Sequence, residues 1–306
     1  MSRSRGTAPL IVGLGGTAIG ALLGSWGGSM MLSGGREATI RDGVPPSSLV
    51  VVVVGAVVGI GLPLVAIGWY FRQQVALAGQ PHRVQAFWLG LAWGTIAMLL
   101  AGTLNVVAGL LPGGPVWPGF VEEFLKLLVP VILLLSSRTY RSPRPAVWLV
   151  FVAAAWLGFL EGISYIITSL DPILDGAPPP SDAPFIMMMD IVVRIIAEVS
   201  HPLITVGAAV LIWLAARTLS TGKAVGVGVL AYLGAAAIHG LNDAVIDGPV
   251  RDWNVPLSIV LEAVYVVAIF VFWFRPRVRR LREFDDSGRG VPPAAVSAGR
   301  DRSTLR

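Results

Sequence analysis

Long apolar stretches alternate with short polar connections along this chain. A transmembrane helix needs about 20 predominantly apolar residues, and about eight stretches reach that length. The pattern therefore predicts an all-α polytopic membrane protein, a bundle of about eight transmembrane helices. The predicted spans are residues 9–32, 48–71, 86–111, 119–136, 146–169, 187–216, 224–246 and 255–274.

The composition supports a membrane protein and excludes several kinds of site. Of the 306 residues, 55% are hydrophobic and 13% are charged, whereas soluble domains carry about 25% charged residues. The absence of cysteine excludes disulfides, thiolate metal sites and a cysteine nucleophile. The net charge of +5 is nearly all arginine, much of it in the tail sequence RPRVRRLREF. A basic tail after a last span is typical of anchoring at a lipid bilayer, so no nucleic-acid partner is expected.

The chain divides into a membrane domain and a tail. Residues 1–276 are expected to form one multi-span domain, and residues 277–306 to be a basic, disordered cytoplasmic tail, because they lack apolar residues for a core. The first span is expected to remain uncleaved. Its glycines recur every four residues, which predicts a close helix-packing surface. They are Gly16, Gly20, Gly24 and Gly28.

Arginines in the short loops predict the orientation. The amino terminus and the second, fourth and sixth loops carry more arginine and lysine than the alternate loops, and cytoplasmic loops show this enrichment. The first loop opposes the trend with Arg36 and Arg41. The balance predicts a multi-pass protein of the cell membrane with both termini in the cytoplasm.

The fourth span opens with three ionisable residues, Glu122, Glu123 and Lys126. A charged side chain in a membrane costs at least a few kcal/mol and marks a functional site by default. Residues three and four apart lie on one helix face, so Lys126 is expected between the two carboxylates.

Three further spans carry ionisable residues. Span five has Glu161, and span seven has His239 and Asp243 one turn apart. On span six one stripe holds Asp190, Arg194, Glu198, His201 and Thr205. At about 1.5 Å per residue, most of the candidate site residues fall within roughly 12 Å of the predicted outer ends, whereas His201 falls roughly 20 Å deep. Four helices thus place ionisable groups in the outer half of the membrane.

Carboxylates beside imidazoles suit the activation of water, which requires a base and then an acid for the leaving amine. The candidate catalytic residues are Glu122, Glu123, Lys126, Glu161, His201, His239 and Asp243. Oxygen and imidazole ligands also suit zinc. If zinc is the cofactor, we expect His201 and His239 as ligands, with Glu161 as the third. Metal-free and metal-assisted mechanisms both remain open at this point.

The ordered motifs resemble the PrsW family of intramembrane proteases, distant relatives of the CAAX-prenyl endopeptidase superfamily. They are E-E-x-x-K at Glu122–Lys126, Glu161 in LGFLEGISY, His201, and His239 with Asp243, within residues 86–250. The resemblance implies an endopeptidase that cleaves a single-span membrane protein near the outer face, as some members cleave anti-sigma factors. Two positions depart from the family pattern. Leu157 replaces the usual phenylalanine, and Gly162 replaces an asparagine that would orient neighbouring groups.

Two other functions compete with a protease. One is a catalytically inactive membrane scaffold of the same fold, and the other is a proton- or cation-coupled transporter that uses the same polar set as a relay. The residues outside this set have structural interpretations. Asn105 is expected to form an interhelical hydrogen bond, Glu262 to pair with an arginine or a backbone group, and the acidic loop 171–184 to border the site as a lid or connector.

Overall fold

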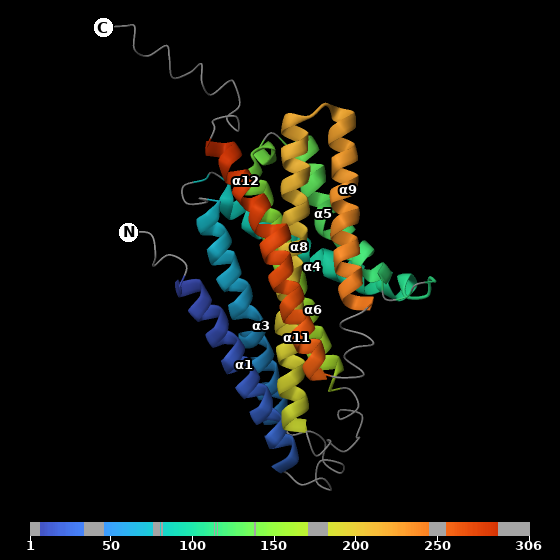
Figure 1. The fold of residues 1–306 in the computed structure, drawn as a ribbon. Helices are drawn as coiled ribbons and strands as arrows, with labels where there is room; N and C mark the ends of the chain where they lie inside the picture. Colours follow the sequence, from blue (N-terminus) through green and yellow to red (C-terminus); the bar gives the residue numbers. More distant parts are fainter. Residues whose placement is uncertain are drawn as a thin grey trace, which may run out of the picture.

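The computed structural model describes residues 7–33, 46–75, 80, 82–112, 114, 116–137, 139–170, 183–244 and 255–286. These residues form helices and no strand, as the apolar pattern predicts (Figure 1). In order, the elements are α1 (Thr7–Ser33), α3 (Pro46–Gln74), α4 (Arg83–Ala108), α5 (Val116–Ser136), η1 (Thr139–Arg141), α6 (Pro143–Thr168), α8 (Ala183–Thr218), α9 (Thr221–Leu241), α11 (Val255–Ala268), η3 (Ile269–Phe274) and α12 (Arg275–Asp286).

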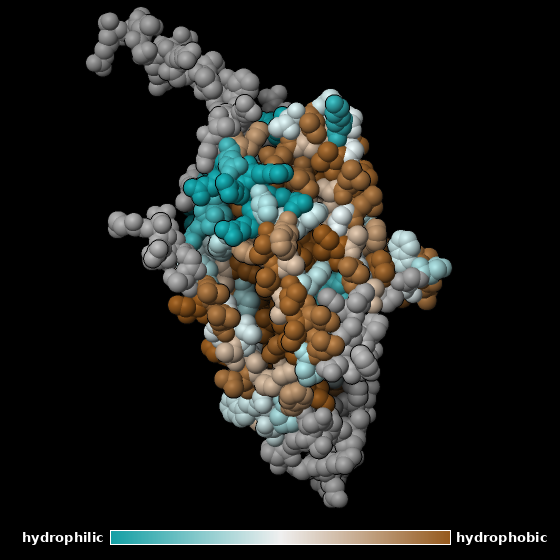
Figure 2. Space-filling view, viewed as in Figure 1, coloured by the Kyte–Doolittle hydropathy of each residue, from teal (hydrophilic) through white to brown (hydrophobic). Residues whose placement is uncertain are grey.

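Each predicted span coincides with a helix of the bundle. Within the described ranges, seven helical segments have the length and hydropathy of a membrane span, the last of them running without a break from α11 through η3 into α12. The eighth bundle helix is α5, which carries three ionisable residues among its 21. Apolar side chains cover the outer surface of the bundle, as expected where lipid is the solvent (Figure 2). The chain is therefore an all-α, multi-pass membrane protein.

The longest helix, α8, is the axis of the bundle. It contacts α1, α3, α6, α9 and α11, and it runs along the whole bundle in Figure 1. Its 36 residues extend about 54 Å, whereas the 21 residues of α5 and of α9 extend about 32 Å each. The amino end of α5 and the carboxyl end of α9 therefore lie part-way along α8 (Figure 1).

The predicted glycine surface of α1 is a packing surface. A Cβ atom on Gly20 would lie 2.4 Å from the Cα of Gly59 in α3, and one on Gly16 would lie equally close to Leu62. Gly24 faces α8 instead, near Ile191. The two backbones approach closely because side chains are absent from this surface.

The sequence predicted a disordered tail from residue 277, but the first part of that segment is helical. Residues 275–286 form α12, because Val278 and Leu281 are buried in the same apolar cluster as Phe71. Burial of one apolar face stabilises this otherwise arginine-rich helix. Residues 287–306, and residues 171–182 of the predicted lid, lie outside the described residues.

Candidate active site

The first turns of α5 bury an acidic pair around a lysine. Lys126 and Glu123 are fully buried, and Glu122 is 3% exposed. The Nζ of Lys126 donates to Glu123 Oε1 at 2.9 Å and to Glu122 Oε2 at 3.4 Å. The predicted position of the lysine between the two carboxylates is confirmed. One ammonium thus compensates two buried carboxylates.

Two uncharged side chains donate further hydrogen bonds to the carboxylates of this pair. Asn105 of α4 donates from Nδ2 to Glu122 Oε1 at 3.0 Å, and Thr205 of α8 donates from its hydroxyl to Glu123 Oε2 at 2.8 Å. The interhelical hydrogen bond expected of Asn105 is confirmed, although its partner could not be read from the sequence. Each carboxylate is thereby tied to a different neighbouring helix.

The two histidines in membrane spans contact one another and the group formed by Glu123 and Lys126. The His201 and His239 rings lie 4.8 Å apart, centroid to centroid, at 75°. His201 Nδ1 is 2.7 Å from Lys126 Nζ, and His239 Nδ1 is 3.1 Å from Glu123 Oε1. The Nε2 atom of His239 lies 3.7 Å from Glu122 Oε2. Residues from α5, α8 and α9 therefore form one polar cluster.

A glycine contact allows α9 to bring His239 this close to α5. A Cβ on Gly119 would lie 2.5 Å from the nitrogen of Gly240, and a Cβ on Gly240 would lie 2.5 Å from the Val116 oxygen. Gly119 precedes the acidic pair by one turn, and Gly240 follows His239 directly. Only glycine permits these two backbones to touch at this crossing.

A second layer of ionisable groups lies on the other edge of His201. Its Nε2 is 3.2 Å from Glu198 Oε2 and 3.6 Å from Glu161 Oε2. Arg194 Nη1 lies 3.7 Å from Glu198 Oε1, and the Arg194 guanidinium lies 4.1 Å from the centre of the Tyr165 ring. The sequence placed Arg194 and Glu198 on the stripe of His201 but did not assign them to the site. Their three- and four-residue spacing from one another and from His201 was the available indication.

These groups line a cavity of about 240 Å³. Glu122 lines it, whereas Glu123 does not. Asp243 lies at its more open edge, with a side chain 27% exposed and Oδ2 3.6 Å from His239 Nε2. The other lining residues are Pro118, Glu161, Tyr165, Arg194, Ala197, Glu198, Ser200, His201, His239 and Asn242. The structure thus gathers every predicted site residue at one place, and it gives the two adjacent glutamates different surroundings.

The two departures from the family pattern have physical reasons here. A Cβ on Gly162 would lie 2.7 Å from Glu198 Cγ and equally close to Ile60 Cδ1, so a larger residue would displace the Glu198 side chain. Leu157 is fully buried and packs with Leu125 in a small apolar cluster. Gly162 therefore makes room for a carboxylate of the site, and Leu157 supports α5 from behind.

Two groups of side chains, which share His201, have the ligand types and the proximity that a metal ion requires. Within each group the ligand atoms lie within 4.8 Å of one another. The groups are Glu122, His201 and His239, and Glu161, Glu198 and His201. The sequence predicted Glu161, His201 and His239, so the structure divides that set between the two groups.

A cationic side chain already lies beside each group. The Lys126 ammonium is close to Glu122 and His201 Nδ1 in the first. Arg194 Nη1 lies 3.7 Å from Glu198 Oε1 in the second. The second group differs in having a carboxylate oxygen without a hydrogen-bond partner in the described part of the chain. In the second group, Glu161 Oε2 is buried and has no hydrogen-bond partner within the described ranges. Two carboxylates and an imidazole are ligands that zinc accepts.

The fold and the site together define a polytopic membrane protein with a buried cluster of carboxylates and histidines beside a cavity. A comparison with protein families matches residues 82–274 to the PrsW family intramembrane metalloproteases. The match covers more than half of the chain and includes every residue of the cluster, and the chain belongs to this family. It is therefore an intramembrane peptide hydrolase that acts on membrane proteins in a lipid environment. No curated protein and no solved structure matched the chain.

Proposed function

We propose that the protein is an endopeptidase in which Glu122 is the general base, and that it cleaves a single-span membrane protein near the outer face. The observation that carries this proposal is the unequal surroundings of the two glutamates. Glu122 lines the cavity, with Oε2 close to both histidines. Glu123 is fully buried, and three side chains occupy its oxygens.

Glu122 takes a proton from a water molecule in the cavity, and the hydroxide attacks the carbonyl carbon of the scissile peptide bond. The carbon–nitrogen bond then breaks, and Glu122 returns the proton to the leaving amine nitrogen. Lys126 donates from Nζ to Glu122 Oε2 and so holds this carboxylate at the edge of the cavity. Glu122 is thus the catalytic residue of the acidic pair.

Glu123 is a positioning residue. Its carboxylate accepts the Nδ1–H of His239, which fixes the ring so that Nε2 points toward Glu122 and Asp243 at the cavity. The same arrangement of carboxylate and imidazole fixes the tautomer and the ring orientation in many hydrolytic sites. His239 therefore orients water or substrate in a fixed geometry.

Glu161, Glu198 and His201 are the residues that would hold a metal ion. A zinc ion held there would act as a Lewis acid on the scissile carbonyl or acidify a bound water. With no metal bound, His201 Nε2 would serve as an N–H donor to the oxyanion. The carboxylates of Glu198 and Glu161 lie near the same nitrogen and would share a bound cation with it.

The location of cleavage follows from the short helices. The site is at the amino end of α5 and the carboxyl end of α9, which lie part-way along α8 (Figure 1). Water can reach a cavity at such helix ends more easily than one surrounded by full-length spans. Arginine enrichment in the loops predicts that this side faces outward. The scissile bond would lie in an extended segment of the substrate, because a helical peptide bond is shielded; an anti-sigma factor is one candidate.

The test compares membrane proteomes of cells that express Glu122→Gln, Glu123→Gln or wild-type protein, by sequencing new protein termini. We expect Glu122→Gln to remove cleavage at normal protein levels. Glu123→Gln should reduce turnover by about tenfold to a hundredfold without raising KM, as for other residues that orient a catalytic histidine.

Glu283→Gln, on the exposed surface of α12, is the matched control and should cleave normally. Full cleavage by Glu122→Gln would reject this residue as the base. Cuts on the cytoplasmic side of substrates would reject the outer location while leaving the base assignment standing.

A further inference from the structure

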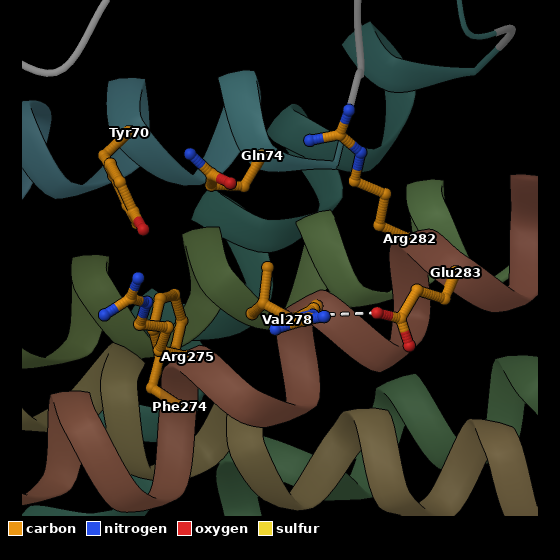
Figure 3. A pocket seen from close by; sticks show the side chains of 8 residues that line it. Tyr70, Gln74, Phe274, Arg275, Val278, Arg282 and Glu283 are labelled. Carbon is orange, nitrogen blue, oxygen red and sulfur yellow. Dashed lines mark hydrogen bonds and ion pairs between the residues drawn. The ribbon is translucent and has the colours of Figure 1, made fainter. Parts of the chain in front are cut away.

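A basic cavity of about 380 Å³ lies between the carboxyl end of α3 and α12, where the last apolar span becomes arginine-rich (Figure 3). Small-molecule sites typically have volumes of about 300 to 1,000 Å³. Tyr70 and Gln74 line the cavity from α3, and the Tyr70 ring extends toward the α12 wall. The other lining residues are Phe274, Arg275, Val278, Arg279, Arg282 and Glu283. In Figure 2 this region is the hydrophilic patch above the apolar surface of the bundle.

The cavity carries an excess of positive charge. Arg279 donates from Nε to Glu283 Oε1 at 2.8 Å, so one of its three arginines is neutralised by its one carboxylate. Arg275 forms no ion pair with an acidic side chain in the described ranges. The Tyr70 hydroxyl and the Gln74 amide add uncharged donors on the facing wall. Such donors suit an anion with several acceptor oxygens, such as a phosphate group.

An apolar groove of about 550 Å³ adjoins this cavity. Tyr70 lines both spaces, and Phe270 of the groove precedes Phe274 of the cavity by one turn. The groove lies between α1, α3, α8 and α11, and most of its surface is aliphatic. An acidic peptide or a free phosphate would use the cavity and leave the groove uncovered. A molecule with an anionic head and a hydrocarbon chain would use both.

We propose that the cavity and the groove together form a binding site for one anionic phospholipid. The phosphate lies among Arg275, Arg279 and Tyr70, and an acyl chain follows the groove past Val267 toward Ala263. The position supports this occupant, since the arginines follow the end of an apolar span, at the level where lipid phosphates lie. Basic pockets beside membrane helices recognise anionic head groups through the same chemistry.

Native mass spectrometry of the full chain, released from nanodiscs of mixed phosphatidylcholine and phosphatidylglycerol, tests the proposal. Wild-type protein should retain phosphatidylglycerol in preference to phosphatidylcholine of the same chain length. Arg275→Ala should lower that preference about tenfold, the effect of one lost charge-assisted hydrogen bond. Arg280→Ala removes the same charge from an exposed position of α12 outside the cavity, and it should keep the preference. An equal loss of preference in the two variants would show that anionic lipid is attracted only by the overall charge of α12, and it would overturn the proposal.

A second pair of variants tests the groove. Val267 and Val264 are both 60% exposed on α11, but only Val267 lines the groove. Val267→Trp should reduce phosphatidylglycerol retention, because the indole fills the path of the chain, and Val264→Trp should not. No effect of Val267→Trp, or displacement of the lipid by millimolar inorganic phosphate, would assign the cavity to a free anion and overturn the lipid site.

Discussion

The Nζ atom of Lys126 lies 2.7 Å from Nδ1 of His201, in a site where both side chains are buried. An ammonium group has donors and no acceptor, so neutral His201 accepts at Nδ1 and carries its proton on Nε2. The Nδ1–H of His239 donates instead to the Glu123 carboxylate, and its Nε2 faces Glu122 and Asp243. The two imidazoles are therefore held by groups of opposite charge.

Removing the lysine charge should destabilise the protein as well as inactivate it. Lys126→Met leaves two neighbouring buried carboxylates without their cation, which costs roughly 3–5 kcal/mol. We expect a lower midpoint of thermal unfolding in detergent and no cleavage. Lys223→Met changes an exposed lysine of α9 and should match the wild type. Equal unfolding midpoints for the two variants would contradict the ion-pair cluster.

Asn105 should matter for turnover. Asn105→Ala removes the donor to Glu122 Oε1, and an unsatisfied buried acceptor costs about 1–3 kcal/mol. That range corresponds to a fall in kcat of about tenfold to a hundredfold. Thr103→Val, on the same helix, removes only a hydroxyl that donates to the Leu99 oxygen. It should leave kcat unchanged, and a similar loss in both variants would argue against a role for the Asn105 bond.

The glycine crossing between α5 and α9 should be required for assembly of the site. Gly240→Ala places a methyl group 2.5 Å from the Val116 oxygen, which is too close, so the two helices must separate. His239 would then leave Glu123, and cleavage should fall with little change in helix content by circular dichroism. Gly226→Ala, a position on α9 with open space around it, is the control. An active Gly240→Ala variant would show that the close crossing is dispensable.

Metal content should depend on the second carboxylate group. Elemental analysis of detergent-purified protein should find zinc, and Glu161→Gln and Glu198→Gln should each reduce the zinc retained after dialysis. Metal ligands must be deprotonated, and the two carboxylates take up protons in acid, so retention should also fall as the pH is lowered. Glu283→Gln should retain zinc as the wild type does. Cleavage that persists after zinc is stripped to a negligible level would favour a metal-free glutamate mechanism.

Reporter fusions should establish the orientation. Arginine enrichment predicts that a fusion after residue 140 reports from the cytoplasm and one after residue 180 from outside. The same experiment locates the mouth of the cavity, since Pro118 and Asp243 are at the amino end of α5 and just after α9, on the side where α6 ends and α8 begins. An external signal from the fusion after residue 140 would show that the predicted orientation is wrong.

The sequence by itself determined the spans and most of the residues of the candidate site. A run of about 20 apolar residues forms a spanning helix because its backbone groups must pair internally in lipid. The same environment makes ionisable residues costly. Glu122, Lys126, Glu161 and His239 are therefore candidates for a functional site even when their neighbours in space are unknown. The four-residue spacing also placed Lys126 beside Glu122.

Only the tertiary structure decided how these residues are arranged around the cavity. The depth predicted for His201, roughly 20 Å, is measured from the outer end of its own span. His201 nevertheless lies beside the ends of α5 and α9, because α8 extends well beyond both of those helices (Figure 1). The choice between Glu122 and Glu123 depends on how α5 is rotated toward α8 and α9. Glu198 joins the site only because Gly162 of another helix leaves it room. Helix length, rotation and crossing distance arise from packing between segments distant in the chain, which a local pattern does not encode.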